Sequence, residues 1–279
     1  MITRLDIIAN LIESLERGGL TQEQLLLYLE DNAHILKSNI EQALLQHKKE
    51  TIDAVLEENL DRYATAQESI LSNYEAFSLA ADRATDQVVS TYGHDIPDIV
   101  LVPCIGLFAN GGWKEQGDDK SYICVALERL SPTAHLDILL THEVAHGIAE
   151  TKWDTVLDGF YGEGHATYVS RVLCPGHPEE AYFFMDKAWL SSCLDWIEGN
   201  RDRIRQDASQ PLQVLNPYHK FYFTTGFNPD YPNIGYVIGY LYLKHLHQEY
   251  TLEELRTFGK TDHPNQAEFA SFISTWTQR

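Results

Sequence analysis

The sequence contains a pentapeptide, His142-Glu143-Val144-Ala145-His146, whose residue types and spacing could activate a water molecule. On an α-helix, residues four apart lie on one face, so the two imidazoles would face a common point. Two neutral imidazoles suit a zinc ion, and Glu143, offset by about 100°, could reach a water molecule beside it. The pattern therefore predicts a zinc-dependent hydrolase with Glu143 as general base; the alternative is a surface helix with coincidental histidines.

A catalytic zinc site needs a third protein ligand and an open fourth position. The longer motif with a third histidine is absent, because Ala149 and Lys152 stand where glycine and histidine would be needed. We expect Glu163 to be the third ligand, from the first turn of a second helix packed against the first. His165 is the alternative, and because it lies two residues further along, it would face nearly the opposite way.

This arrangement resembles the gluzincin metallopeptidases, which bind zinc through the two histidines of HExxH and a glutamate from a downstream helix. The closer resemblance is to the DUF2268 family of predicted bacterial zinc-dependent proteases, in which EGxA and GYxxGY segments follow the HExxH helix. Here these segments are Glu163-Gly164-His165-Ala166 and Gly235-Tyr236-Val237-Ile238-Gly239-Tyr240, and the resemblance covers about residues 98–250. It implies a zincin-like zinc peptidase with His142, His146 and Glu163 as ligands. The 16 residues between His146 and Glu163 are slightly fewer than in the aminopeptidase branch of gluzincins.

Hydrolysis of a peptide bond also needs a hydrogen-bond donor for the carbonyl oxygen as it gains negative charge. In gluzincins a tyrosine or histidine from a later segment donates this bond. We expect Tyr236, near the start of a helix over Gly235 to Tyr250, to take this role, with Tyr231 as the alternative. The chain has 15 tyrosines, so a helical pair such as Tyr236 and Tyr240 is also typical of a plain core.

The elements before the motif predict a helical region followed by a small sheet. A helical stripe runs from Leu5 to Leu15, and Thr21 with Gln24 predicts a capping box that begins a second helix. Longer helical patterns cover about Ala33 to Leu60 and Tyr63 to Tyr92. We therefore expect an N-terminal helical region over residues 1–95 and a catalytic domain over residues 96–279.

Two apolar runs rich in β-branched residues, Asp98 to Pro103 and Tyr122 to Leu127, predict strands on either side of an Asn110-Gly111-Gly112 turn. We expect them to form a small antiparallel sheet, with the second strand at an edge that could pair with an extended peptide substrate. Ser131 and Pro132 predict the start of the helix that carries the histidines. The fold class is thus α+β and mostly helical.

The composition excludes some classes of binding partner. The chain of 279 residues carries 41 acidic and 21 basic residues, and its net charge of −20 argues against nucleic acid or an anionic membrane as a partner. We expect no membrane span and no targeting segment, because no long apolar run is present. The four cysteines are far apart and read as reduced thiols, which favours the cytoplasm.

The function that these observations predict is a zinc-dependent peptidase acting on peptide or protein substrates. A protein that binds zinc without turnover, on a peptidase-like scaffold, is the principal alternative. An amidase acting on other substrates would use the same residues, and only the shape of its pocket would distinguish it.

Overall fold

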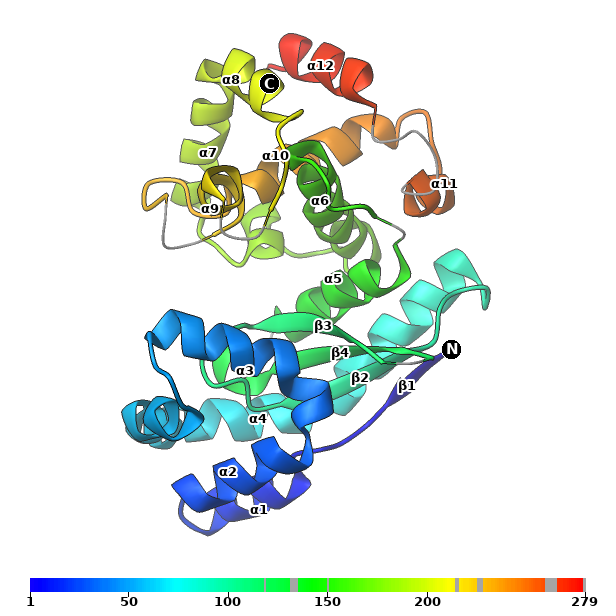
Figure 1. The fold of residues 1–279 in the computed structure, drawn as a ribbon. Coiled ribbons are helices and arrows are strands. Elements are labelled where there is room, and N and C mark those ends of the chain that lie inside the picture. The colour runs from blue at the N-terminus through cyan, green and yellow to red at the C-terminus, as the bar shows by residue number, and fades with distance from the viewer. Residues whose placement is uncertain are drawn as a thin grey trace. The chain divides into compact units, whose positions relative to one another are not determined.

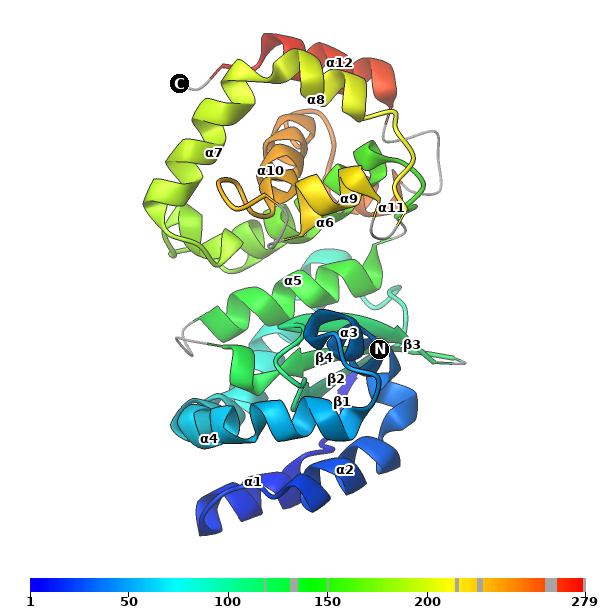
Figure 2. The same cartoon turned by 60° about the vertical axis from the view of Figure 1, so that its left-hand side comes forward.

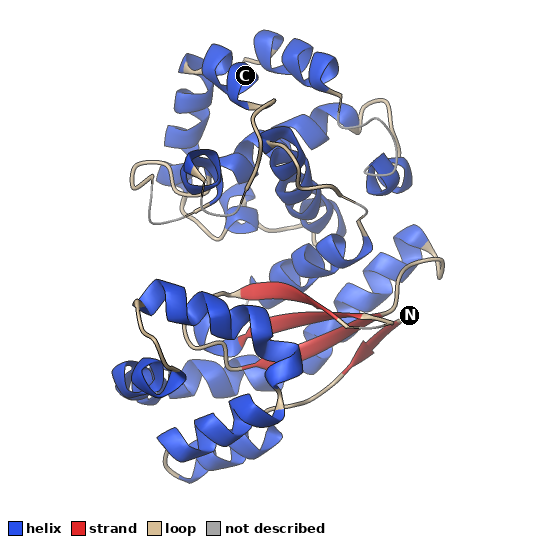
Figure 3. Cartoon of the chain, viewed as in Figure 1, coloured by secondary structure: helices blue, strands red, loops and turns tan. Residues whose placement is uncertain are grey.

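The computed structural model describes residues 1–117, 119–130, 135–149, 151–213, 216–224, 228–258 and 265–277. These residues form mainly helices together with one four-stranded sheet, as Figures 1 and 3 show. None of the helices in these ranges combines the length and the apolar character that crossing a bilayer requires. The chain divides into two compact units, Met1–Gly147 and Ile148–Arg279. The change from helices to strands predicted near residue 95 falls inside the first unit.

The first unit is built on a mixed sheet with the strand order β1-β2-β4-β3. The strands are β1 (Ile2–Arg4), β2 (Ile99–Cys104), β3 (Gly112–Gln116) and β4 (Ser121–Ala126). β1 and β2 are parallel, as are β2 and β4, whereas β3 is antiparallel to β4. The two predicted strands are present, but the prediction that they form an antiparallel sheet is wrong. The reason is β3, whose polar residues Lys114 to Gln116 gave no strand signal.

The sheet order also corrects the predicted place of the second strand. β4 lies between β2 and β3 and is hydrogen-bonded to both, so its backbone cannot receive an extended peptide. β3 is instead the terminal strand on that side of the sheet.

Four helices precede β2: α1 (Ala9–Arg17), α2 (Gln22–Asp31), α3 (Ala33–His47) and α4 (Ile52–Tyr92). The predicted capping box is confirmed, because the Thr21 side chain accepts from Gln24 N–H and the Gln24 side chain accepts from Thr21 N–H. The expected helix from Ala33 to Leu60 is interrupted, since Lys48 adopts a left-handed conformation and Thr51 caps a new helix. No glycine or proline marks this break in the sequence.

Helix α5 (Leu136–Ile148) carries the HExxH motif and packs on the sheet. Its close approach depends on Gly147, where an added Cβ would lie 2.8 Å from Ile99 Cδ1 and 3.4 Å from Ile123 Cδ1. α3 lies on the opposite face, where Ile35 accepts a hydrogen bond from the Cys124 thiol (Figure 2). The sheet thus supports the helix that carries the histidines. The predicted helix start at Ser131 and Pro132 lies outside the described residues.

The second unit is helical. Its helices are α6 (Val156–Leu173), η3 (Glu179–Phe183), α7 (Lys187–Gly199), α8 (Arg201–Asp207), α9 (Pro217–Phe223), α10 (Ile234–Leu246), α11 (Leu252–Thr257) and α12 (Gln266–Thr275). α6 and α10 pack together, and α7, α8 and α12 curve around α10 (Figure 2). The predicted helix over Gly235 to Tyr250 is thus present as α10, although it ends at Leu246.

Two glycines explain the tight packing of α6 on α10. A Cβ added at Gly239 would lie 1.9 Å from the Phe160 carbonyl oxygen, and one at Gly164 would lie 2.2 Å from the Gly239 carbonyl carbon. The two backbones therefore meet without intervening side chains. The EGxA and GYxxGY segments contribute one glycine each to this crossing, so these glycines serve the packing of two helices.

Candidate metal site

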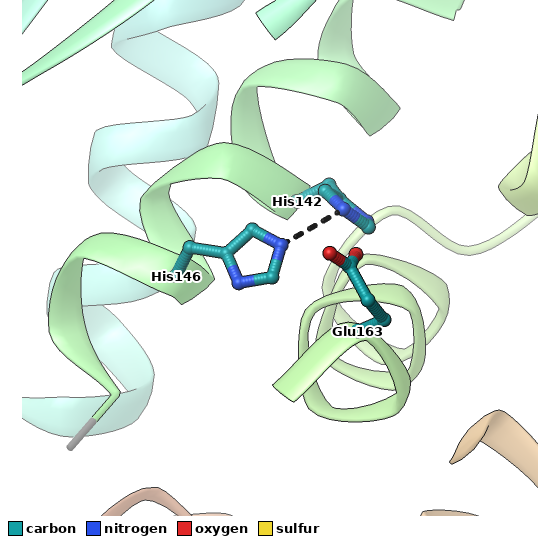
Figure 4. A group of neighbouring side chains, drawn as sticks. All are labelled: His142, His146 and Glu163. Carbon is teal, nitrogen blue, oxygen red and sulfur yellow. Dashed lines mark hydrogen bonds between the residues drawn. The ribbon is translucent and has the colours of Figure 1, made fainter. Parts of the chain in front are cut away.

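Helix α5 brings two imidazole nitrogens to one place. The Nε2 atoms of His142 and His146 lie 3.2 Å apart, and the two rings meet edge to face (Figure 4). A tetrahedral zinc ion with Zn–N bonds of about 2.0–2.1 Å holds two nitrogen ligands about 3.3 Å apart. The separation observed along α5 thus fits two ligands of one ion. His142 is 4% exposed, which limits competition from water for these nitrogens.

Glu143 lies between these histidines in the sequence and is itself buried, at 8% exposure. Its carboxylate packs against the start of β3, because a Cβ added at Gly112 would lie 2.5 Å from the Glu143 Oε1 atom. The absence of a side chain at Gly112 therefore leaves the space that the carboxylate occupies. Sequence reasoning placed Gly112 in a turn and gave no sign that it would touch the candidate general base.

Glu163 lies in the middle of α6, so its predicted place in the first turn of a helix is wrong. The helix begins earlier because Thr155 and Asp158 form a capping box: the Thr155 hydroxyl accepts from Asp158 N–H, and the Asp158 carboxylate accepts from Thr155 N–H. A threonine followed three residues later by an acidic residue is a recognisable sequence signal for a helix start. Within the helix, Glu163 directly precedes Gly164, where α10 crosses α6.

One ligand atom from each of His142, His146 and Glu163 lies within 4.8 Å of the other two, and the three side chains point toward a common region in Figure 4. Among the residues that the structure describes, this is the one group of three or more histidine, cysteine or acidic side chains placed to hold a metal. Two imidazoles and one carboxylate are the donor set of many catalytic zinc sites, which leave a fourth position for water. The residues therefore fit zinc by chemistry as well as by spacing.

The rival ligand His165 is not a member of this group. Its side chain is buried within the second unit, at 1% exposure, and its ring stacks on that of Tyr161 at 6.3 Å between centroids. This agrees with the expectation that Glu163 and His165, two residues apart on a helix, face different directions.

The candidate donor Tyr236 lies in the first turn of α10, where it is partly buried. It precedes Gly239 by one turn, and Gly239 contacts Gly164 of α6. Glu163 is the neighbour of Gly164 in the chain, so Tyr236 and Glu163 both lie within about one turn of the crossing of their helices.

The other two tyrosines have contacts that point to packing. The Tyr240 hydroxyl donates to Glu179 Oε1 at 2.6 Å, which ties α10 to η3. The Tyr231 ring packs on Trp196, with 5.9 Å between centroids. Tyr240 and Tyr231 thus serve the packing of the second unit, and Tyr236 is kept as the candidate donor.

His219 interacts electrostatically with Glu163, and the sequence analysis did not identify it. Burial lowers the pKa of the His219 imidazole, while the negative charge of Glu163 acts in the opposite direction. The Glu163 charge thus acts on the His219 ring within the second unit. Its spacing from the HExxH motif carried no signal, because only the packing of α9 on α6, where Tyr222 contacts Phe160, brings the Glu163 charge to bear on the ring.

No protein-family model, no curated protein and no solved structure matches this chain. The arrangement of the side chains, and not a relative, therefore carries the functional argument.

Proposed function

We propose that this protein is a zinc-dependent peptidase of the gluzincin type. The observation that carries the proposal is the group of His142, His146 and Glu163, whose ligand atoms lie within 4.8 Å of one another. These three residues would hold the ion, and Glu143 would act as general base from the same helix as the two histidines.

The chemistry follows from the residues around the group. Bound zinc lowers the pKa of water and polarises a carbonyl group. The Glu143 carboxylate accepts a proton from the attacking water and later delivers it to the leaving amine nitrogen. The backbone at Gly112 holds this carboxylate in place from one side. The Tyr236 hydroxyl donates a hydrogen bond to the substrate carbonyl oxygen as that oxygen gains negative charge.

The position of β3 in the sheet supports a peptide as the substrate. β3 is the terminal strand and begins at Gly112, beside Glu143. An extended peptide paired with β3 would run past the general base, and backbone hydrogen bonds would supply affinity for many sequences. In this proposal β3 takes the role that the sequence suggested for β4.

Two further observations support the proposed family and a cytoplasmic location. The EGxA and GYxxGY segments resemble those of the DUF2268 proteases, and here they pack against each other at Gly164 and Gly239. None of the four cysteines, all buried and described by the structure, is in a disulfide, which suits the reducing cytoplasm.

Removal of the metal tests the proposal. We expect the purified protein to cleave members of a peptide library, to lose this activity after treatment with a chelator, and to regain it on addition of zinc. Cleavage that persists without metal would contradict the proposal. Zinc binding with no cleavage of any peptide would assign the chain to the alternative without turnover.

A further inference from the structure

A buried carboxyl group lies beyond the end of β4, and the proposed chemistry does not use it. Glu128, in the short helix η1 (Leu127–Arg129), is 8% exposed, and burial raises the pKa of its carboxyl to about 7. Its Oε1 atom accepts hydrogen bonds from the backbone N–H groups of Gly106 at 2.8 Å and Phe108 at 3.1 Å. Burial of an ionisable group is costly, so an acidic residue here needs a physical reason.

The reason lies in the turn that these N–H groups belong to. Leu107 and Phe108 have φ angles of 56° and 55°, a left-handed conformation that residues with side chains rarely adopt. The Phe108 ring contacts Tyr63, at 4.7 Å between centroids, and the guanidinium of Arg62, at 3.9 Å from its centroid. The Glu128 carboxylate holds the backbone of the same turn, so the turn keeps a shape that its sequence disfavours.

The residue that follows this turn contacts the candidate general base. Gly111 accepts a hydrogen bond from Ala126 N–H at 2.9 Å, which ties the end of the turn to β4. The next residue is Gly112, whose missing Cβ leaves the space taken by the Glu143 carboxylate. A shift of the turn by a fraction of an ångström would therefore move the backbone on which Glu143 rests.

We propose that Glu128 is a positioning residue that acts through the turn at residues 105–112 to fix the place of the Glu143 carboxylate. The catalytic part of this inference rests on the proposed function, because it gives Glu143 the role of general base. The mechanical link does not, since it lies within the first unit and needs neither metal nor substrate.

The test uses Glu128→Ala in the full chain, with Glu128→Asp as the milder change should the alanine variant not fold. Aspartate keeps the charge, but it is one methylene too short to reach both N–H groups. Glu128→Gln is the conservative variant, because its amide oxygen can still accept both bonds. Val55→Ala is the control for lost stability: Val55 is fully buried, and it precedes Tyr63 by about 12 Å along α4.

The first measurement is the melting temperature of metal-free protein in a double-mutant cycle with Glu143→Ala. We expect the shifts of Glu128→Ala and Glu143→Ala to be non-additive, because both loosen the same turn, whereas those of Val55→Ala and Glu143→Ala add. Additive shifts for the Glu128 pair would overturn the link.

The second measurement is kcat and KM of the zinc-loaded enzyme on the library peptide that the wild type cleaves fastest. We expect Glu128→Ala to lower kcat at least tenfold with KM and zinc content within threefold of wild type, and Glu128→Gln to restore kcat. An equal loss of kcat in Val55→Ala would reduce Glu128 to a structural role and refute the inference. A wild type that binds zinc without cleaving peptides would refute the proposed function, and the melting cycle would still decide the link.

Discussion

Replacement of Glu143 by glutamine is expected to lower kcat by a factor on the order of 10³ while zinc stays bound, because general bases contribute about 10²–10⁴ in rate. Glutamine has the size of glutamate, so it can occupy the same space against Gly112. Its neutral amide cannot take a proton from water at the pH of the assay. The loss should therefore appear in kcat and leave the binding of the ion unchanged.

The measurement compares peptide cleavage and zinc content in the Glu143→Gln variant and the wild type. Glu57→Gln is the matched control, because it removes one carboxylate from an exposed position on α4 and should keep full activity. Cleavage at the wild-type rate by a fully zinc-loaded Glu143→Gln variant would exclude Glu143 as the base. A parallel loss of zinc would mean that the variant reports on metal binding instead.

The second large effect is on stability. Gly239→Ala should lower the free energy of unfolding by about 3 kcal/mol, the upper part of the range for overpacked cores. The added Cβ would lie 1.9 Å from the Phe160 carbonyl oxygen, and a backbone atom cannot rotate away as a side chain can. α6 and α10 would have to move apart, which would disturb the helix that carries Glu163.

Gly199→Ala provides the control in the same unit. Gly199 ends α7, and an added Cβ there has no atom within 4 Å, so this change should be neutral or slightly stabilising. Denaturant unfolding followed by circular dichroism measures both variants. Equal stability of Gly239→Ala and the wild type would show that the crossing of α6 and α10 is looser than the structure has it.

Local signals in the sequence were sufficient for several elements. The capping box at Thr21 and Gln24 marks the start of α2, and the apolar runs mark β2 and β4 within one residue at either end. The spacing of His142 and His146 placed both imidazoles on one helical face, and the structure has their Nε2 atoms 3.2 Å apart. These features depend on residues close together in the chain, where periodicity and hydrogen-bond chemistry act directly.

Features that depend on distant residues could not be predicted in this way. The order of the sheet depends on the position of β3 beside β4. The polar residues of β3 resemble those of a loop. Contacts of Gly112 with Glu143 and of Glu128 with the turn at Gly106 join segments more than 20 residues apart. The influence of the Glu163 charge on His219 likewise requires the packing of the second unit. Only the three-dimensional fold shows these neighbours.

The zinc content of protein purified without added metal or a metal-binding tag tests the central claim most directly. Elemental analysis of the wild type, Glu163→Ala and His165→Ala would be made in parallel. The proposed site predicts about one zinc ion per chain in the wild type and in His165→Ala, and loss of most of it in Glu163→Ala. A wild type that holds no zinc even after reconstitution, or a Glu163→Ala variant that retains it, would contradict the account.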